Sequence, residues 1–120
     1  MRHKIALLAL VLIATSLFAQ AAPRSERVLD DATRLAALLH DVQREVTVSE
    51  SLWRTIANEA NTLANRIYAR TRGDGRTAAA EVRTHVRAMR TAALRGNAAE
   101  ARRHAREAMP ALMRVIGWAH

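Results

Sequence analysis

Six arginines in the C-terminal half of the chain have the type and spacing of an anion-binding surface. Arg83, Arg87 and Arg90 follow one another at intervals of four and three residues, which places them on one face of a helix. Three more crowd the start of the next predicted helix, where the backbone also favours anions: Arg102, Arg103 and Arg106. The pattern predicts contact with an acidic envelope protein or an anionic lipid surface, and the alternative is a solvated face.

A second group of residues has the type needed to hold a haem or a transition metal. In an up-down-up-down bundle, His40, Met89 and His104 fall at similar distances from one end, about 9 Å along the helix axes. Two histidines, or a histidine and a methionine, at one level of a bundle can hold a b-type haem without cysteine. His40 and His104 lie beside their apolar stripes, however, so the alternative is boundary histidines with one solvated edge, and we expect no cofactor.

Three asparagines form a polar seam in the stretch IANEANTLANRIYA. Asn58, Asn61 and Asn65 recur at intervals of three and four residues on one helix. Their amides could form hydrogen bonds to a neighbouring helix or bind a partner. The alternative is a polar border beside the apolar positions Leu63 and Ile67.

The chain has no sequence motif that predicts catalysis. It lacks the G-x-S-x-G, H-E-x-x-H and glycine-rich phosphate-loop patterns. Asp30 and Asp31, and likewise Asp41 with Glu45, are interpreted as solvated helix surface. The sequence therefore predicts a protein that is not an enzyme.

The first 21 residues have the pattern of a secretory signal peptide. A short basic start is followed by the apolar run IALLALVLIATSLF, and Ala19 and Ala21 give a small-residue cleavage pattern. We expect cleavage after Ala21 and a mature chain of residues 22–120 with no transmembrane helix. The chain has no cysteine, which excludes disulfides, thiolate metal sites and covalently attached haem. A bacterial periplasmic or secreted protein is predicted.

Positive charge is concentrated in the second half of the predicted mature chain. Residues 22–60 carry five arginines and seven acids, whereas residues 61–120 carry twelve arginines and four acids. This asymmetry predicts one positive face or end. Nucleic acid is not the expected partner, because export argues against it and few aromatic side chains could stack on bases.

Periodicity and capping signals predict four helices. Apolar residues recur every three or four positions over the ranges 26–46, 50–71, 76–95 and 98–118. Ser25 is the expected cap of the first helix, and Thr47 with Glu50 forms a capping box for the second. Gly73-Asp74-Gly75 is the expected break between two hairpins. Gly96 is expected to end the third helix, and Asn97 with Glu100 to cap the fourth.

Four helices of similar length joined by short loops predict one all-α domain. The expected fold is an antiparallel up-down-up-down four-helix bundle with an alanine-rich core. Pro110 lies inside the fourth helix and is expected to kink it or split it in two. The function predicted is non-catalytic binding through the basic C-terminal hairpin, and the alternative is a periplasmic haem or metal carrier.

Overall fold

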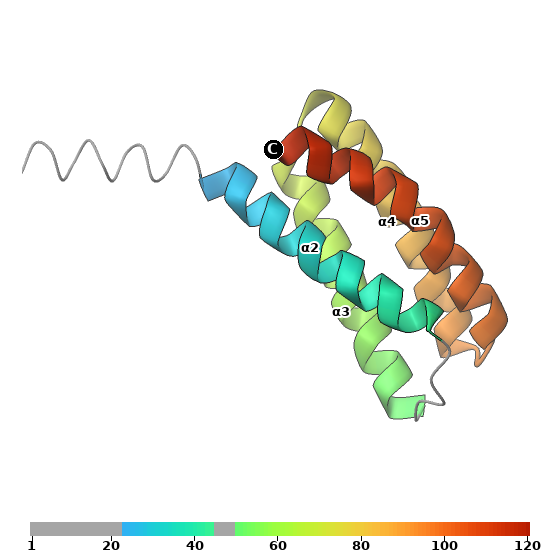
Figure 1. Cartoon of the computed structure of the whole chain (residues 1–120). Coiled ribbons are helices and arrows are strands. Elements are labelled where there is room, and N and C mark those ends of the chain that lie inside the picture. Colours follow the sequence, from blue (N-terminus) through green and yellow to red (C-terminus); the bar gives the residue numbers. More distant parts are fainter. Residues whose placement is uncertain (1–22, 45–49) are drawn as a thin grey trace, which may run out of the picture.

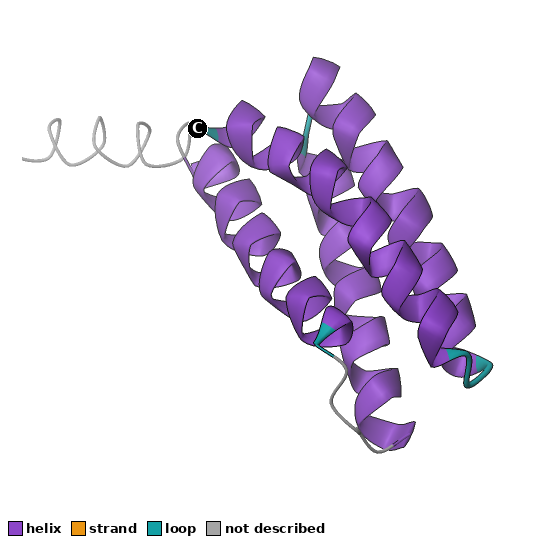
Figure 2. Ribbon diagram, turned by 45° about the vertical axis from the view of Figure 1, so that its right-hand side comes forward, coloured by secondary structure: helices purple, strands orange, loops and turns teal. Residues whose placement is uncertain are grey.

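The computed structural model describes residues 23–44 and 50–120, and this part of the chain is all-helical (Figure 2). Its four helices are α2 (Pro23–Gln43), α3 (Glu50–Arg70), α4 (Gly73–Leu94) and α5 (Ala98–Ala119). The described residues contain no strand. The predicted signal peptide and Thr47 of the predicted capping box lie outside the described residues.

Each helix packs against two others, an arrangement compatible with a four-helix bundle. Helix α2 contacts α3 and α5, and α4 also contacts α3 and α5 (Figure 1). The apolar stripes of all four helices meet in one buried cluster, in which more than half of the residues are alanine. Small side chains let helix backbones approach closely, although each buries less apolar surface than leucine does. The larger side chains include Leu35, Ile67, Met89 and Leu112, one from each helix.

The first two helix starts differ in how well the sequence predicted them. Helix α3 begins at Glu50 as expected, whereas α2 begins at Pro23, three residues before the predicted start. Ser25 therefore lies inside α2 rather than before it, and its prediction as a cap is wrong. Proline fits the first turn of a helix because the missing N–H would have no intrahelical partner there.

The predicted break at Gly73-Asp74-Gly75 is narrower than expected: Gly73 has φ of +55°, as a chain break requires, but Asp74 and Gly75 lie inside α4. All three residues belong to the first turn of α4, and the chain is extended at Arg72, whose φ is −141°. Asp74 lies where the helix dipole favours an acid. Gly75 is buried against the indole of Trp118, which a β-carbon on residue 75 would overlap. The absence of a side chain thus serves helix packing here rather than chain reversal.

The turn between α4 and α5 follows the sequence prediction closely. Gly96 has φ of +75°, and the Asn97 N–H donates to the carbonyl of Ala92 at 2.9 Å, closing the end of α4. The Asn97 side chain then accepts a hydrogen bond from the Glu100 N–H at 3.2 Å. This turn fixes the register of α5 against α4. Helix α5 continues through Pro110, so the predicted alternative of two short helices is wrong.

Candidate functional site

The arginines of α4 lie against α3. The guanidinium carbon of Arg83 is 3.7 Å from the centre of the Tyr68 ring, and that of Arg76 is 4.5 Å from it. The Arg90 Nε donates to the side-chain oxygen of Asn58 at 2.8 Å. A hydrogen bond with Arg76 and its positive charge, with a smaller contribution from Arg83, lower the pKa of the Tyr68 hydroxyl. These contacts engage α4 arginines within the protein.

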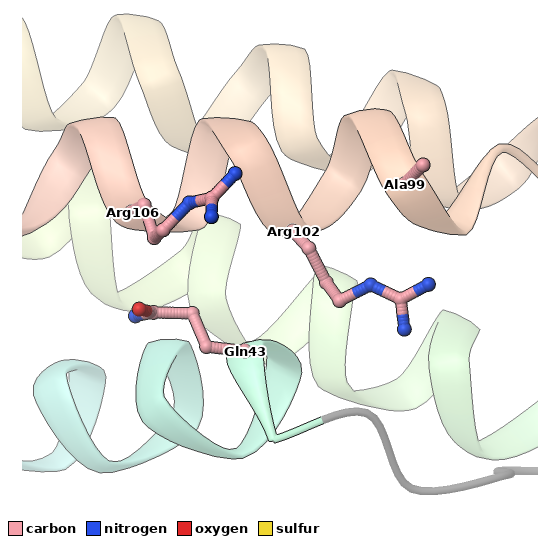
Figure 3. A pocket seen from close by; sticks show the side chains of 4 residues that line it. All are labelled: Gln43, Ala99, Arg102 and Arg106. Atoms are coloured by element: carbon pink, nitrogen blue, oxygen red, sulfur yellow. The ribbon is translucent and has the colours of Figure 1, made fainter.

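Two arginines of α5 lie instead on the side that faces α2. Arg102 and Arg106 line a pocket of about 350 Å³ together with Ala99 of α5 and Gln43 of α2. Figure 3 shows Arg102 extending toward the C-terminal end of α2 and Gln43 rising from α2 toward α5. None of these four described lining residues carries a carboxylate. Within the described part of the chain, Arg106 forms no ion pair or hydrogen bond through its side chain.

The other two predicted arginines have different surroundings. Arg103 is 3.0 Å from a carboxylate oxygen of Glu100 and 3.6 Å from one of Glu107, both on its own helix. Arg87 is exposed. The structure therefore separates the six arginines: two of α4 contact α3, two of α5 lie on the side of α2, one lies within an ionic cluster of α5, and Arg87 is exposed.

The asparagine seam contains one hydrogen bond between helices. Asn58 of α3 accepts a hydrogen bond from Arg90 of α4, so one of the three amides bonds to a neighbouring helix. Asn61 is half-buried, and its side-chain oxygen has no hydrogen-bond partner within residues 23–44 and 50–120. Asn65 is exposed. The three amides thus share a helix face without sharing an environment.

The residues predicted to hold haem or metal differ in their exposure. His40 is exposed, Met89 is fully enclosed in the core, and His104 is half-buried. His104 lies instead beside His85 and Glu107, and one potential ligand atom from each of the three lies within 4.8 Å of the other two. His40 belongs to no such group of His, Asp and Glu in the described residues.

Sequence reasoning missed the ionic cluster between α2 and α3. Asp31 is buried, so its interpretation as solvated surface is wrong. Arg66 donates to its two oxygens at 2.6 and 3.3 Å, and Arg70 donates at 3.1 Å. The hydrogen bond and negative charge of Asp31 raise the pKa of Arg66. The sequence did contain a signal that Asp31 is buried. Asp31 lies three residues after Val28 and four before Leu35, both on the apolar stripe of the same helix.

Three comparisons with known proteins found no match for this chain. No protein-family model matches the sequence, and searches of curated proteins and of solved structures find no match. Among the described residues, none of the helices is both long and apolar enough to span a lipid bilayer. The proposals below therefore depend on the residues themselves.

Proposed function

We propose that this chain is a non-catalytic binding protein, exported to the bacterial periplasm or beyond, that recognises an anionic partner. The partner is an acidic envelope protein or an anionic membrane surface. The binding site proposed is the pocket between α2 and α5 that contains Arg102, Arg106 and Gln43. The observation that carries this proposal is Arg106, which lines this pocket and whose side chain has no ionic or hydrogen-bonding partner among the described residues.

The chemistry of the pocket favours phosphate or carboxylate. A guanidinium presents several N–H donors in a planar fork that matches two oxygens of either group. The Gln43 amide nitrogen donates to the Leu39 carbonyl at 3.1 Å, which positions the amide at the edge of α2. The excess of arginine over acid in residues 61–120 adds a favourable long-range potential for an anion.

The proposal includes an antiparallel order of neighbouring helices, which sets α2 beside α5. Contacts between α2 and α3 support it, because Asp31 meets Arg66 and Arg70 while Arg34, later in α2, meets the earlier Glu59. Between α4 and α5, an earlier residue of one helix likewise contacts a later residue of the other. Glu81 pairs with Arg114, and His85 lies near Glu107.

Binding to lipid vesicles tests the proposal directly. Purified protein should bind phosphatidylglycerol vesicles but not phosphatidylcholine vesicles, and binding should weaken as salt rises because the Debye length falls from about 10 Å at 0.1 M to about 3 Å at 1 M. R102Q/R106Q should weaken binding, and the control R34Q/R44Q, which removes one arginine of α2 and one directly after its end, should not. Native envelope extract passed over immobilised protein provides the test for an acidic protein.

The results separate the two partner classes. Vesicle binding identifies a membrane surface, and salt-sensitive retention of an acidic protein without vesicle binding identifies a protein partner. If neither vesicles nor any acidic protein is retained at low salt, or if R102Q/R106Q binds as the unmodified protein does, the proposed function is wrong.

A further inference from the structure

Two histidines and a glutamate converge between α4 and α5. His104 and Glu107 are three residues apart on one face of α5, and His85 approaches them from α4. The Nδ1 atoms of His85 and His104 lie 3.5 and 3.6 Å from the same Glu107 oxygen, Oε2. The imidazole centres are 6.4 Å apart. Three side chains of metal-ligating type therefore share one small space.

The Nδ1 atom of His104 is buried and has no hydrogen-bond partner among the described residues. Buried polar atoms without a partner are rare in folded proteins, because leaving them unpaired is destabilising. The neighbouring carboxylate is too distant for a good hydrogen bond to this nitrogen. A neutral imidazole nitrogen also offers a lone pair, which a metal ion can use.

We propose that His85, His104 and Glu107 bind a divalent transition-metal ion of the zinc or copper type. Zinc binds imidazole nitrogen and carboxylate oxygen at about 2.0 to 2.2 Å, so neighbouring ligand atoms in a tetrahedral site lie about 3.3 to 3.6 Å apart. The two histidine-to-glutamate distances, 3.5 and 3.6 Å, already have this separation, and all three ligand atoms lie within 4.8 Å of one another. Nitrogen ligands favour zinc, copper or nickel over magnesium or calcium.

Arg103 and an adjoining surface pocket also bear on metal binding at this site. The other oxygen of Glu107, Oε1, lies 3.6 Å from Arg103, which leaves Oε2 directed at the histidines. His104 also borders a surface pocket of about 430 Å³, lined further by Thr91, Arg95 and Asn97, through which an ion can enter. Three protein ligands leave the fourth tetrahedral position for water or an external group.

This inference is independent of the anion-binding function proposed above. The metal site faces α4, whereas the arginine pocket faces α2, and the two share no residue. It retains His104 from the set predicted from sequence and replaces His40 and Met89 with His85 and Glu107.

Zinc titration of the native protein, purified without an affinity tag, tests the site. Competition against a chromophoric chelator should show one Zn²⁺ bound per chain, and excess Zn²⁺ should raise the melting temperature. His85→Ala and His104→Ala should each weaken binding at least tenfold, because loss of even a residue that only supports a metal ligand costs about 10- to 100-fold. His40→Ala is the matched control, since it removes an exposed histidine from α2 and should leave the affinity unchanged.

Glu107→Gln keeps the test decisive if a histidine variant fails to fold. Glu107 is exposed and outside the core cluster, so its substitution should preserve helix content by circular dichroism while weakening Zn²⁺ binding about tenfold. The proposal is overturned if the native protein binds no Zn²⁺ at micromolar concentration. It is also overturned if His40→Ala reduces the affinity as much as His104→Ala does.

Discussion

Arg83 with Arg90 of α4, and Arg102 with Arg106 of α5, each share a helix face by their spacing, but the two pairs have different surroundings in the structure. Arg83 and Arg90 contact Tyr68 and Asn58 of α3. Arg102 and Arg106 line a pocket with Gln43 of α2, and Arg106 forms no side-chain ion pair or hydrogen bond in the described part of the chain. One pair is engaged inside the protein, and the other lines a space that an external anion can enter.

This difference shows what arginine spacing can and cannot predict. Intervals of three and four residues place side chains on one helix face, but they do not determine which neighbouring helix lies beside that face. An arginine stacked on tyrosine or bonded to an amide contributes to packing. Arg106, which lines the pocket and has no side-chain partner among the described residues, remains available to a ligand.

Asp31 is a buried carboxylate that pairs with two arginines, Arg66 and Arg70. Breaking these ion pairs should give the largest effect on stability. Asp31→Asn leaves Arg66 and Arg70 without their buried carboxylate partner, so the free energy of unfolding should fall by about 2 kcal/mol. Urea unfolding measures the loss. The neighbouring exposed residue provides the control, since Asp30→Asn should change stability by about 0.5 kcal/mol or less. Equal effects of the two substitutions would contradict a structural role for Asp31.

A smaller effect is expected at the turn that separates the α4 arginines from the α5 arginines. Gly96 has φ of +75°, so Gly96→Val should cost at least about 1 kcal/mol. Gly117 lies inside α5 with open space around its α-carbon, and Gly117→Ala should stabilise the protein by up to about 1 kcal/mol. Thermal unfolding of both variants measures these changes. An unchanged melting temperature for Gly96→Val would place the turn elsewhere.

The smallest effect is a change in the titration of Tyr68, which reports directly on the engaged arginines. Because its pKa is lowered in the folded protein, Tyr68 loses its proton at lower pH than the unfolded chain does. Its contribution to stability therefore grows as pH rises through the folded pKa toward the ordinary value of 10.0.

Ultraviolet absorbance resolves this titration because the chain has one tyrosine. Arg76→Gln should move the midpoint upward, since Arg76 is the largest cause of the shift. Arg106→Gln removes the same charge elsewhere and should leave the midpoint in place. A midpoint that moves equally in both variants would show that net charge, rather than contact, sets the pKa.

Much of the helical framework could be predicted from the sequence because its signals are local. Gly96 and Asn97 specify a helix end and a helix start through their own backbone and side-chain atoms. Gly75 was misjudged because its role depends on Trp118, which is far away in the sequence. A glycine run indicates conformational freedom, but the contact that requires the small residue is tertiary.

The candidate sites were less predictable because each joins two helices. Arg102 and Arg106 were two of the six arginines predicted to form one surface, but their pocket with Gln43 depends on how α2 packs on α5. The partnership of His85 with Glu107 depends on the register of α4 against α5, which no spacing within one helix encodes. The buried state of Asp31 likewise depends on two arginines of α3.

Binding of phosphatidylglycerol vesicles by two variants of equal charge tests the central claim most directly. R102Q/R106Q and R83Q/R90Q each remove two positive charges, one pair from the α2–α5 pocket and the other from the α3–α4 contact. At about 1 kcal/mol for each arginine near an anionic surface, R102Q/R106Q should weaken binding about 30-fold. R83Q/R90Q should weaken it about twofold or less, because its charges are directed at α3 and act only through a screened field. Equal losses in the two variants would contradict a specific site at the pocket and leave only the overall positive charge of the chain.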